Sequence, residues 1–160
     1  MAPLAVGRKA PELALETDRD IPFRLSEQSG SPVVIFFYPE DDTEGCTIEN
    51  IEFSRLLPEF EALGARVLGV SPDTVEKHCR FRDKHHLAVP LAADPELKTI
   101  KRYGAWGPKK MFGHAYDGVI RTTVLVDGKG KIAGLWKVTR IKGHAATALE
   151  AVKKLVAGAA

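Results

Sequence analysis

Two cysteines, Cys46 and Cys79, are the residues of this 160-residue chain with the most distinctive chemistry. Cys46 follows the polar loop PEDDTEG, which comes after a long apolar run, and it lies where the next helix is predicted to begin. At a helix N-terminus, free backbone N–H groups and the helix dipole favour a thiolate over a thiol. The thiolate is the nucleophilic form of cysteine, so this position predicts a reactive sulfur.

The helix dipole alone is too weak to ionise this thiol. A cysteine that is mostly thiolate at neutral pH needs about 3.4 kcal/mol of preferential stabilisation of its anion. The dipole supplies at most about 2 kcal/mol, so a cation or further donors must lie near the sulfur. Arg121 is the best candidate, because it interrupts VIRTTVLV, a run that is otherwise apolar or β-branched. The alternative is an exposed arginine on an edge strand, the commoner environment for this residue type.

Alternating strand and helix patterns must position these residues. Residues 12–26 are typical of a hairpin, and PVVIFFY (residues 32–38) is typical of a strand buried on both faces of a mostly parallel sheet. The further predicted elements are a helix ended by Gly64, a strand over 65–70, a helix from Ser71-Pro72-Asp73 to about His86, an edge strand over 87–93 that contains Pro90, a short helix from Asp94 to Gly104, a hairpin of 119–126 and 131–138, and a C-terminal helix around 149–156.

This order, a hairpin followed by β-α-β-α-β-α-β-β-α, predicts the α/β class with a mixed central sheet flanked by helices. A thioredoxin-like fold with an N-terminal β-hairpin fits it. A chain of 160 residues buries roughly 70% of its unfolded surface, enough for one core, so we expect a single domain over residues 1–160.

Composition excludes several classes of protein. The net charge of +2 offers little attraction for nucleic acid or an anionic membrane, and no segment approaches 18 apolar residues. The N-terminal segment has no apolar run of signal-peptide length, so we expect a cytoplasmic protein. Two cysteines are too few for a disulfide-rich secreted scaffold.

The loop around Cys46 resembles the active-site loop of a known family. Residues 38–49, YPEDDTEGCTIE, are similar to the P-x3-T-x2-C loop of the peroxiredoxins, and DDTEGCTIE resembles the bacterioferritin comigratory protein, or peroxiredoxin Q, subfamily. VGRKAPELAL, YGAWG, YDGVIRTTVLVD and the final helix also resemble their counterparts, so the resemblance covers essentially the whole chain.

The resemblance implies a thiol peroxidase that reduces hydrogen peroxide and organic hydroperoxides. It implies no metal or bound organic cofactor, regeneration by an external dithiol such as thioredoxin, and a monomer. Cys46 is then the peroxidatic cysteine, Thr43 forms hydrogen bonds at the peroxide oxygens, and Pro39 shields the nucleophile. Arg121 stabilises the thiolate and the transition state. Glu49 also matches the motif, although a solvated glutamate in the first helical turn is an adequate alternative.

A second thiol can capture the sulfenic acid that forms at Cys46. Many relatives place this resolving cysteine five residues later, where the chain has Ile51, and others place it on the next helix. Cys79 lies there, one turn before Arg82, the position with which that resolver often aligns. Because a disulfide needs Cα atoms within about 7 Å, a resolving Cys79 predicts local unwinding. Otherwise Cys79 is a structural residue in a 1-Cys peroxidase.

Other functions fit the pattern less well. A dithiol reductase would need Cys-x-x-Cys, and the chain has Cys46-Thr-Ile-Glu49. His78, Cys79, His85 and His86 share helix faces but lack the two close ligand pairs of structural zinc sites. A non-catalytic redox sensor or holdase remains a rival, and negligible peroxide turnover would identify it.

Overall fold

The computed structural model describes residues 4–159. Its centre is a five-stranded sheet in the order β5-β4-β3-β8-β9. The strands are β3 (Val33–Phe37), β4 (Arg66–Ser71), β5 (Leu91–Ala93), β8 (Thr122–Val126) and β9 (Ile132–Lys137). β3, β4 and β5 are parallel, whereas β8 is antiparallel to β3 and to β9. The predicted mixed sheet is therefore confirmed, with β5 at an edge as Pro90 indicated.

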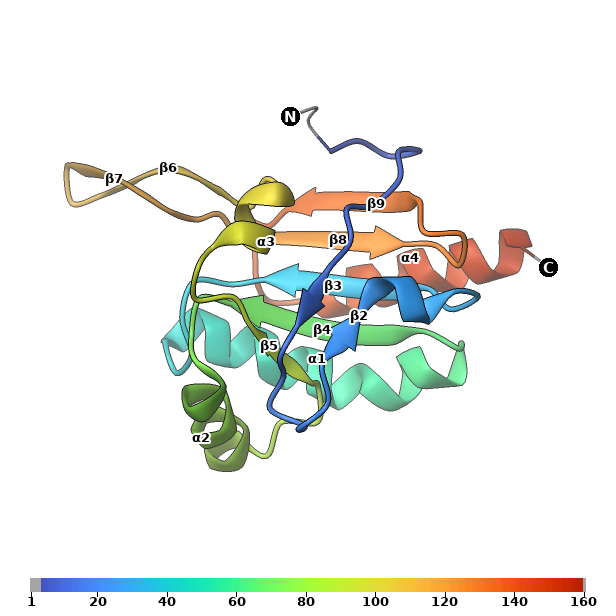
Figure 1. Cartoon of the computed structure of the whole chain (residues 1–160), viewed down its shortest axis with the longest axis horizontal. Helices are drawn as coiled ribbons and strands as arrows, with labels where there is room; N and C mark the ends of the chain where they lie inside the picture. Colours follow the sequence, from blue (N-terminus) through green and yellow to red (C-terminus); the bar gives the residue numbers. More distant parts are fainter. Residues whose placement is uncertain (1–3, 160) are drawn as a thin grey trace.

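Helices cover one face of the sheet, and shorter elements cover the other (Figure 1). The long helices α1 (Glu44–Ala62) and α4 (His144–Ala159) pack together on one face. The opposite face carries the hairpin of β1 (Ala14–Leu15) and β2 (Phe23–Arg24), the 3-10 turn Leu25–Gln28 and α3 (Lys98–Arg102). α2 (Val75–His85) contacts β5 at the sheet edge. No helix in this described part of the chain is long and apolar enough to span a membrane.

Burial on both faces explains the continuous apolar run of β3. Its five residues are all buried, and alternate side chains join different clusters. Phe36 points toward the helical layer, where its ring stacks on that of Phe53 with centroids 4.3 Å apart. Phe37 points the other way and packs near Tyr103. β3 is thus held firmly between two packed layers, and the loop that follows it begins from a rigid base.

The predicted start of α2 at Ser71 is wrong by several residues. Ser71 is the last residue of β4, and the helix begins at Val75 with Thr74 as its N-cap, whose side chain accepts from the Lys77 N–H at 3.2 Å. Ser71 and Asp73 instead contact each other, and the Ser71 hydroxyl donates to the Asp73 carboxylate at 2.6 Å. The Ser-Pro-Asp turn is therefore a connection between β4 and α2.

The sequence prediction also missed an antiparallel arm, β6 (Trp106–Met111) and β7 (His114–Val119). The arm projects from the body of the protein (Figure 1). Most of its residues are exposed, so it lacks the alternation of buried and polar residues that marks a packed strand. Its turn places Phe112 and Gly113 at positive φ, the geometry of tight hairpin turns. Arg121 consequently lies between β7 and β8 and is not inside a strand.

Candidate active site

The fold brings the loop after β3 and the segment before β8 to the same edge of the sheet. Because β8 runs antiparallel to β3, Phe37 at the end of β3 pairs with Thr122 at the start of β8. The next residue of the loop, Tyr38, still bonds to β4 through its N–H and the Val70 carbonyl at 3.0 Å. The loop that leads to Cys46 and the residue that precedes Thr122 are therefore neighbours in space.

Cys46 is the third residue of α1 and is buried, with a relative exposure of 1%. Thr43 is the N-cap, and the first helical bond to its carbonyl comes from the Thr47 N–H at 2.9 Å. The backbone N–H groups of the first turn before Thr47 thus have no intrahelical partner, and they point toward the loop. This is the environment predicted for a nucleophilic cysteine at a helix start.

Arg121 supplies the predicted cation. Its Nη2 donates to Cys46 Sγ at 3.3 Å, and its Nη1 donates to Glu49 Oε1 at 2.6 Å. Burial alone would lower the pKa of Arg121, but the adjacent Glu49 and Cys46 raise it above its ordinary value, so the guanidinium stays charged. One planar group therefore contacts both the sulfur and its supporting carboxylate.

Gly45 lies at the start of α1, close to Ile141 and Arg121. A Cβ atom at position 45 would lie 2.8 Å from Ile141 Cδ1 and 3.4 Å from Arg121 Nη2. The first of these distances is too short for a real Cβ atom, so a larger residue would require the Ile141 side chain to move, whereas the second is at the lower limit of ordinary packing. Gly45 thus leaves room for the Ile141 side chain beside the start of α1.

Glu49 is not the solvated glutamate that the sequence left as an alternative. Its exposed fraction is 1%, and it faces Arg121 one turn along the helix from Cys46. Burial raises the pKa of Glu49 from 4.5 to about 7, although the Arg121 charge and hydrogen bond act in the opposite direction. Within residues 4–159, Glu49 Oε2 and Asn50 Oδ1 are buried oxygens without a hydrogen-bond partner.

We expect Glu49→Gln to remove a pH-dependent loss of stability. The pKa of Glu49 is about 7 in the folded protein and 4.5 in its ordinary state, so the unfolded chain ionises first as pH rises. Stability from this group is complete below pH 4.5 and is lost as pH rises to about 7, a loss of about 3 kcal/mol. Urea unfolding of the reduced protein at pH 5 and pH 8, values chosen at about the two ends of this window, should show a smaller difference in the variant.

Glu59→Gln is the matched control, because Glu59 is exposed on the same helix. It should leave the pH dependence of the wild type unchanged. Parallel pH dependences for Glu49→Gln and the wild type would contradict the assignment.

Thr43 and Pro39 lie on the same loop, at its two ends. The Thr43 hydroxyl donates to the Glu40 carbonyl at 2.9 Å, and the side chain is exposed to solvent. Pro39 is half-buried and directly follows the buried Tyr38. The structure thus places both on the loop before Cys46, and their contacts with peroxide stay predictions.

Cys79 lies on α2, where its side chain faces the N-terminal segment. It is half-buried, and its Sγ lies 3.9 Å from the Asp18 carbonyl oxygen. Arg82 Nη1 donates to the same carbonyl, so positions 79 and 82 share one helix face as predicted. Cys46 and Cys79 are both unpaired thiols. A bond between them would require α2 to rearrange.

The possible metal ligands of α2 do not converge. Cys79 faces Asp18, whereas His85 Nε2 lies 3.0 Å from Asp42 Oδ1, and His86 is exposed. His78 points in a third direction, into the protein. The zinc alternative for these residues is therefore wrong.

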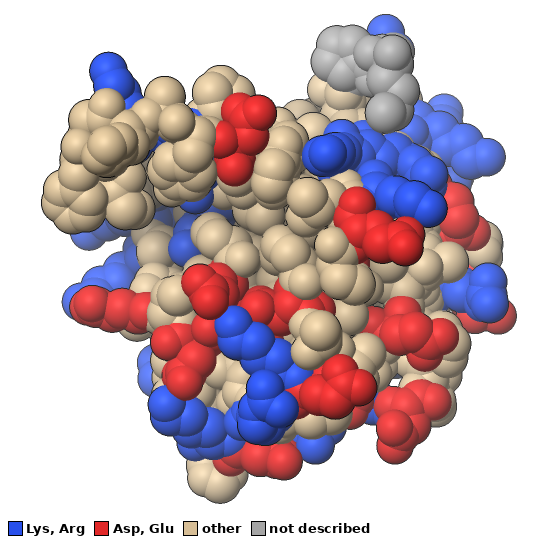
Figure 2. Space-filling view, turned by 60° about the vertical axis from the view of Figure 1, so that its left-hand side comes forward, with Lys and Arg blue, Asp and Glu red and all other residues tan. Residues whose placement is uncertain are grey.

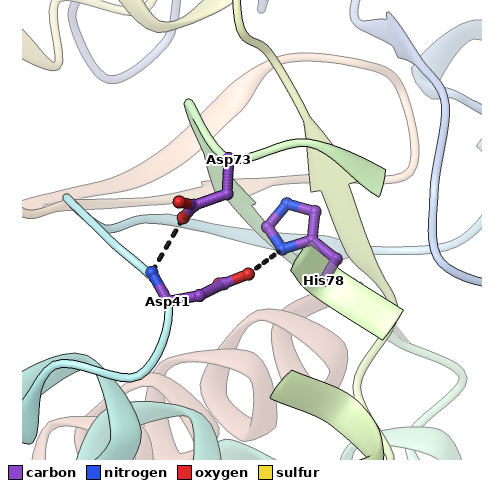
Figure 3. Close-up of side chains that lie close together, drawn as sticks. All are labelled: Asp41, Asp73 and His78. Atoms are coloured by element: carbon purple, nitrogen blue, oxygen red, sulfur yellow. Dashed lines mark hydrogen bonds and ion pairs between the residues drawn. The ribbon is translucent and has the colours of Figure 1, made fainter. Parts of the chain in front are cut away.

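A buried polar network, which no pattern in the sequence indicated, lies beside the loop that leads to Cys46 (Figure 3). His78 Nδ1 lies 2.6 Å from Asp41 Oδ2, and the Tyr38 hydroxyl donates to Asp41 Oδ1 at 2.6 Å. The Asp41 N–H donates to Asp73 Oδ2 at 2.8 Å. The available signal was the match between the acidic EDD of the loop and the basic residues of α2, but charge alone does not predict burial.

Lys109, on the arm, is also closer to the site than expected. Lysine side chains are usually exposed, yet Lys109 is half-buried and its Nζ donates to the Val119 carbonyl at 2.9 Å. Burial and the Arg121 charge lower its pKa, whereas Cys46 acts in the opposite direction. Lys109 thus lies within electrostatic range of both Arg121 and Cys46.

Comparisons with known proteins agree with this geometry. The model of the AhpC/TSA family matches residues 6–134. The chain is 39% identical over 152 residues to peroxiredoxin Bcp of Bacillus subtilis (95% of this chain, 97% of the relative) and 37% identical over 143 residues to a putative peroxiredoxin bcp of Coxiella burnetii (89% and 95%).

Solved structures of the same group are also similar. Xanthomonas campestris peroxiredoxin Q superposes with a TM-score of 0.85 at 35% identity, covering 90% of this chain and 91% of that one. A mutant of Xylella fastidiosa PrxQ gives 0.89 at 30% identity, covering 96% and 98%. A structure of X. campestris bacterioferritin comigratory protein, concerned with its alkyl peroxide reduction activity, gives 0.87 at 33%, covering 95% and 99%. These neighbours confirm the thioredoxin-like fold class.

Proposed function

We propose that Cys46 is the peroxide-reducing cysteine of this chain, which belongs to the AhpC/TSA family and is a peroxiredoxin, a thiol-dependent peroxidase. One observation carries the assignment. The buried Cys46 sulfur lies in the first turn of α1 with the Arg121 guanidinium 3.3 Å away, so a helix N-terminus and a cation both act on it. This is the environment in which a thiolate is stable and nucleophilic.

In the first step the Cys46 thiolate attacks one oxygen of the peroxide. An S–O bond forms and the O–O bond breaks, so the sulfur is oxidised to a sulfenic acid. The other oxygen leaves as hydroxide or alkoxide and takes up a proton, giving water or an alcohol. Arg121 stabilises the charge as it moves from sulfur to oxygen, Thr43 donates and accepts hydrogen bonds at the peroxide, and Pro39 excludes water.

The substrates are hydrogen peroxide and organic hydroperoxides. Support for the organic class comes from the X. campestris relative, whose structure was studied for alkyl peroxide reduction. The reaction balances with thiols, peroxide and protons alone, so it requires neither metal nor organic cofactor.

In the second step the Cys79 thiol attacks the sulfenic sulfur of Cys46. The S–S bond forms, the S–O bond breaks and water leaves. An external dithiol, such as thioredoxin, then reduces this intramolecular disulfide and is itself oxidised. The position of Cys79 on the face of α2 shared with Arg82 supports this role. Because both cysteines belong to the same chain, the protein works as a monomer. Its unpaired thiols fit a reducing compartment such as the cytoplasm.

Replacement of Cys79 with serine tests the division of roles. Cys79→Ser should reduce one equivalent of peroxide per chain at the wild-type rate, because the first step uses only the Cys46 loop. Sustained turnover with thioredoxin, thioredoxin reductase and NADPH should fall at least about tenfold, since a sulfenic acid without a resolving thiol is open to overoxidation. Rapid mixing with peroxide and the coupled assay measure the two quantities.

The competing assignment is a 1-Cys peroxidase in which Cys79 is structural. The contact between Cys79 Sγ and the Asp18 carbonyl, which ties α2 to the N-terminal segment, favours it. On that assignment, Cys79→Ser would keep wild-type turnover with a dithiol reductant.

A further inference from the structure

The catalytic loop is bound to α2 by a row of ion pairs. Each acidic residue of the loop segment 40–42 has a basic partner on that helix: Glu40 with Lys77 at 3.1 Å, Asp41 with His78 at 2.6 Å, and Asp42 with Lys84 at 2.7 Å and His85 at 3.0 Å. Figure 2 shows acidic and basic side chains interleaved on the lower part of the face where α2 lies. The loop that leads to Cys46 and the helix that carries Cys79 are thus docked on each other.

Only one of these pairs is fully buried. The side chains of Asp41 and His78 are both 0% exposed, whereas Lys84 and Asp42 are 60% and 42% exposed. Exposed pairs contribute little to stability, because water and salt screen them. Breaking a buried pair by removing one partner is costly, because the other group is left uncompensated. The Asp41–His78 pair therefore dominates the attachment of α2 to the loop.

The hydrogen bonds of His78 and Asp41 connect the pair to neighbouring elements. His78 Nδ1 faces Asp41 Oδ2, and His78 Nε2 faces the Ala92 carbonyl at 3.0 Å. Each ring nitrogen of His78 therefore has one hydrogen-bond partner, and the two partners come from different elements. Asp41 is held in turn by the Tyr38 hydroxyl and, through its N–H, by Asp73. The pair is thus a hydrogen-bonded bridge from β5 through α2 to the loop that leads to Cys46.

A bound cation is not needed to explain the cluster. Ligand atoms of Asp41, Asp73 and His78 lie within 4.8 Å of one another. However, the Asp41 oxygens already accept from His78 and Tyr38, and Asp73 Oδ2 accepts from Ser71 and from the Asp41 N–H. The cluster therefore satisfies its own hydrogen bonds.

Each member of the pair lies close in sequence to one of the two cysteines of the proposed reaction. Asp41 precedes Thr43 by two residues and Cys46 by five, and His78 is adjacent to Cys79. His78 points into the protein while Cys79 points toward Asp18, so α2 cannot turn Cys79 toward Cys46 while His78 stays in place. Release of Cys79 thus requires the Asp41–His78 contact to break.

We propose that Asp41 and His78 are a positioning pair that couples the two steps, an inference that rests on the proposed roles of Cys46 and Cys79. While intact, the pair holds the loop in the arrangement that attacks peroxide. When α2 unwinds the pair breaks, so its strength limits how fast Cys79 reaches the oxidised Cys46. The same pair therefore sets how long the sulfenic acid is exposed to a second peroxide.

His78→Asn tests this coupling, because the proposal predicts that the substitution changes the rates of the two steps in opposite directions. The first oxidation should slow by about tenfold as the loop loses its anchor, while disulfide formation should accelerate by about tenfold because α2 opens more often. The peroxide concentration that converts half of Cys46 to sulfinic acid should rise in parallel. Stopped-flow fluorescence and intact-mass spectrometry of quenched samples give these three values.

Tyr38→Phe is the milder variant, in case His78→Asn does not fold. It removes only the hydroxyl that donates to Asp41 Oδ1, and should shift both rates in the same opposed directions by about threefold. Lys77→Met removes the contacts of a partly exposed lysine with Glu40 and Asp73, and it should change neither rate by more than about twofold. Val152→Ala in α4 controls for general destabilisation, since Val152 is buried far along the chain from α2.

Hydrogen exchange of the reduced protein tests whether the loop and α2 are coupled, and it requires no reaction at either cysteine. Peptides over 75–85 and over 38–46 should both exchange faster in His78→Asn than in Val152→Ala of equal melting temperature. Faster exchange in α2 alone would overturn the proposal. So would a His78→Asn variant in which the rates of first oxidation and of disulfide formation both fall, as expected of general destabilisation. If the wild type forms no Cys46–Cys79 disulfide, the resolving role of Cys79 fails, and hydrogen exchange still decides whether the pair couples loop and helix.

Discussion

Peroxide turnover should disappear when Cys46 is replaced with serine. On the proposed mechanism the Cys46 sulfur is the atom that is oxidised. A serine hydroxyl at the same place is neither ionised nor oxidisable by peroxide, so Arg121 would have no anion to stabilise. We expect a loss of at least about 10⁴-fold, in line with removal of a nucleophile from other enzymes. The coupled assay with a dithiol reductant measures the loss.

The variant must be shown to be folded, because Cys46 is one of the residues through which α1 contributes to the buried core. A far-ultraviolet spectrum and a cooperative thermal transition are sufficient. Cys79→Ser is the matched control, since it also replaces a thiol with a hydroxyl and should keep the first oxidation. More than about 1% of wild-type turnover in folded Cys46→Ser would contradict the assignment of the nucleophile.

Replacement of Arg121 with glutamine should slow the first oxidation by about 10² to 10³-fold, the usual effect of removing one donor from a charge-stabilising site. Glutamine cannot supply a positive charge to Sγ, so the fraction of Cys46 present as thiolate should fall, and ultraviolet absorbance of the thiolate follows that fraction. Arg121→Lys should recover only part of the rate, because an ammonium group lacks the planar fork that contacts both Cys46 and Glu49.

Arg121→Gln also leaves Glu49 buried without its counter-charge, so loss of activity has to be separated from loss of stability. The double variant Arg121→Gln, Glu49→Gln also removes the buried ionisable group. It should regain most of the free energy of unfolding and none of the activity. Arg140→Gln changes an exposed arginine and should behave as the wild type. Recovery of activity in the double variant would show that Arg121 is structural.

Local sequence patterns predicted the strands that are buried on both faces and the elements that end at a glycine or at a turn sequence. The apolar run of β3, the end of α1 before Gly64 and the hairpin of β8 and β9 agree with the structure, because burial and turn chemistry act there in the same direction. The arm of β6 and β7 was missed because neither strand packs a face against the core. Its pairing comes from register and a tight turn, which hydrophobic periodicity does not report.

The reactive thiol was predictable, but the charged groups around it were only partly so. Cys46 has a local signal, since a loop and a helix start are adjacent in sequence, and Arg121 stands out within an apolar run. Glu49 and His78 are polar residues on helices, where exposure is the default expectation. Their burial depends on partners 72 and 37 residues away, Arg121 and Asp41, and no local pattern encodes such pairs.

A peptide map of the protein after one equivalent of peroxide tests the account most directly. The reduced protein is oxidised, quenched with an alkylating reagent and digested without reductant. We predict one cross-linked species in the wild type, a Cys46–Cys79 disulfide, and a sulfenic acid at Cys46 that dimedone traps in Cys79→Ser. Oxidation of Cys79 with Cys46 still reduced, or a sulfinic acid at Cys46 with Cys79 free in the wild type, would contradict the two roles.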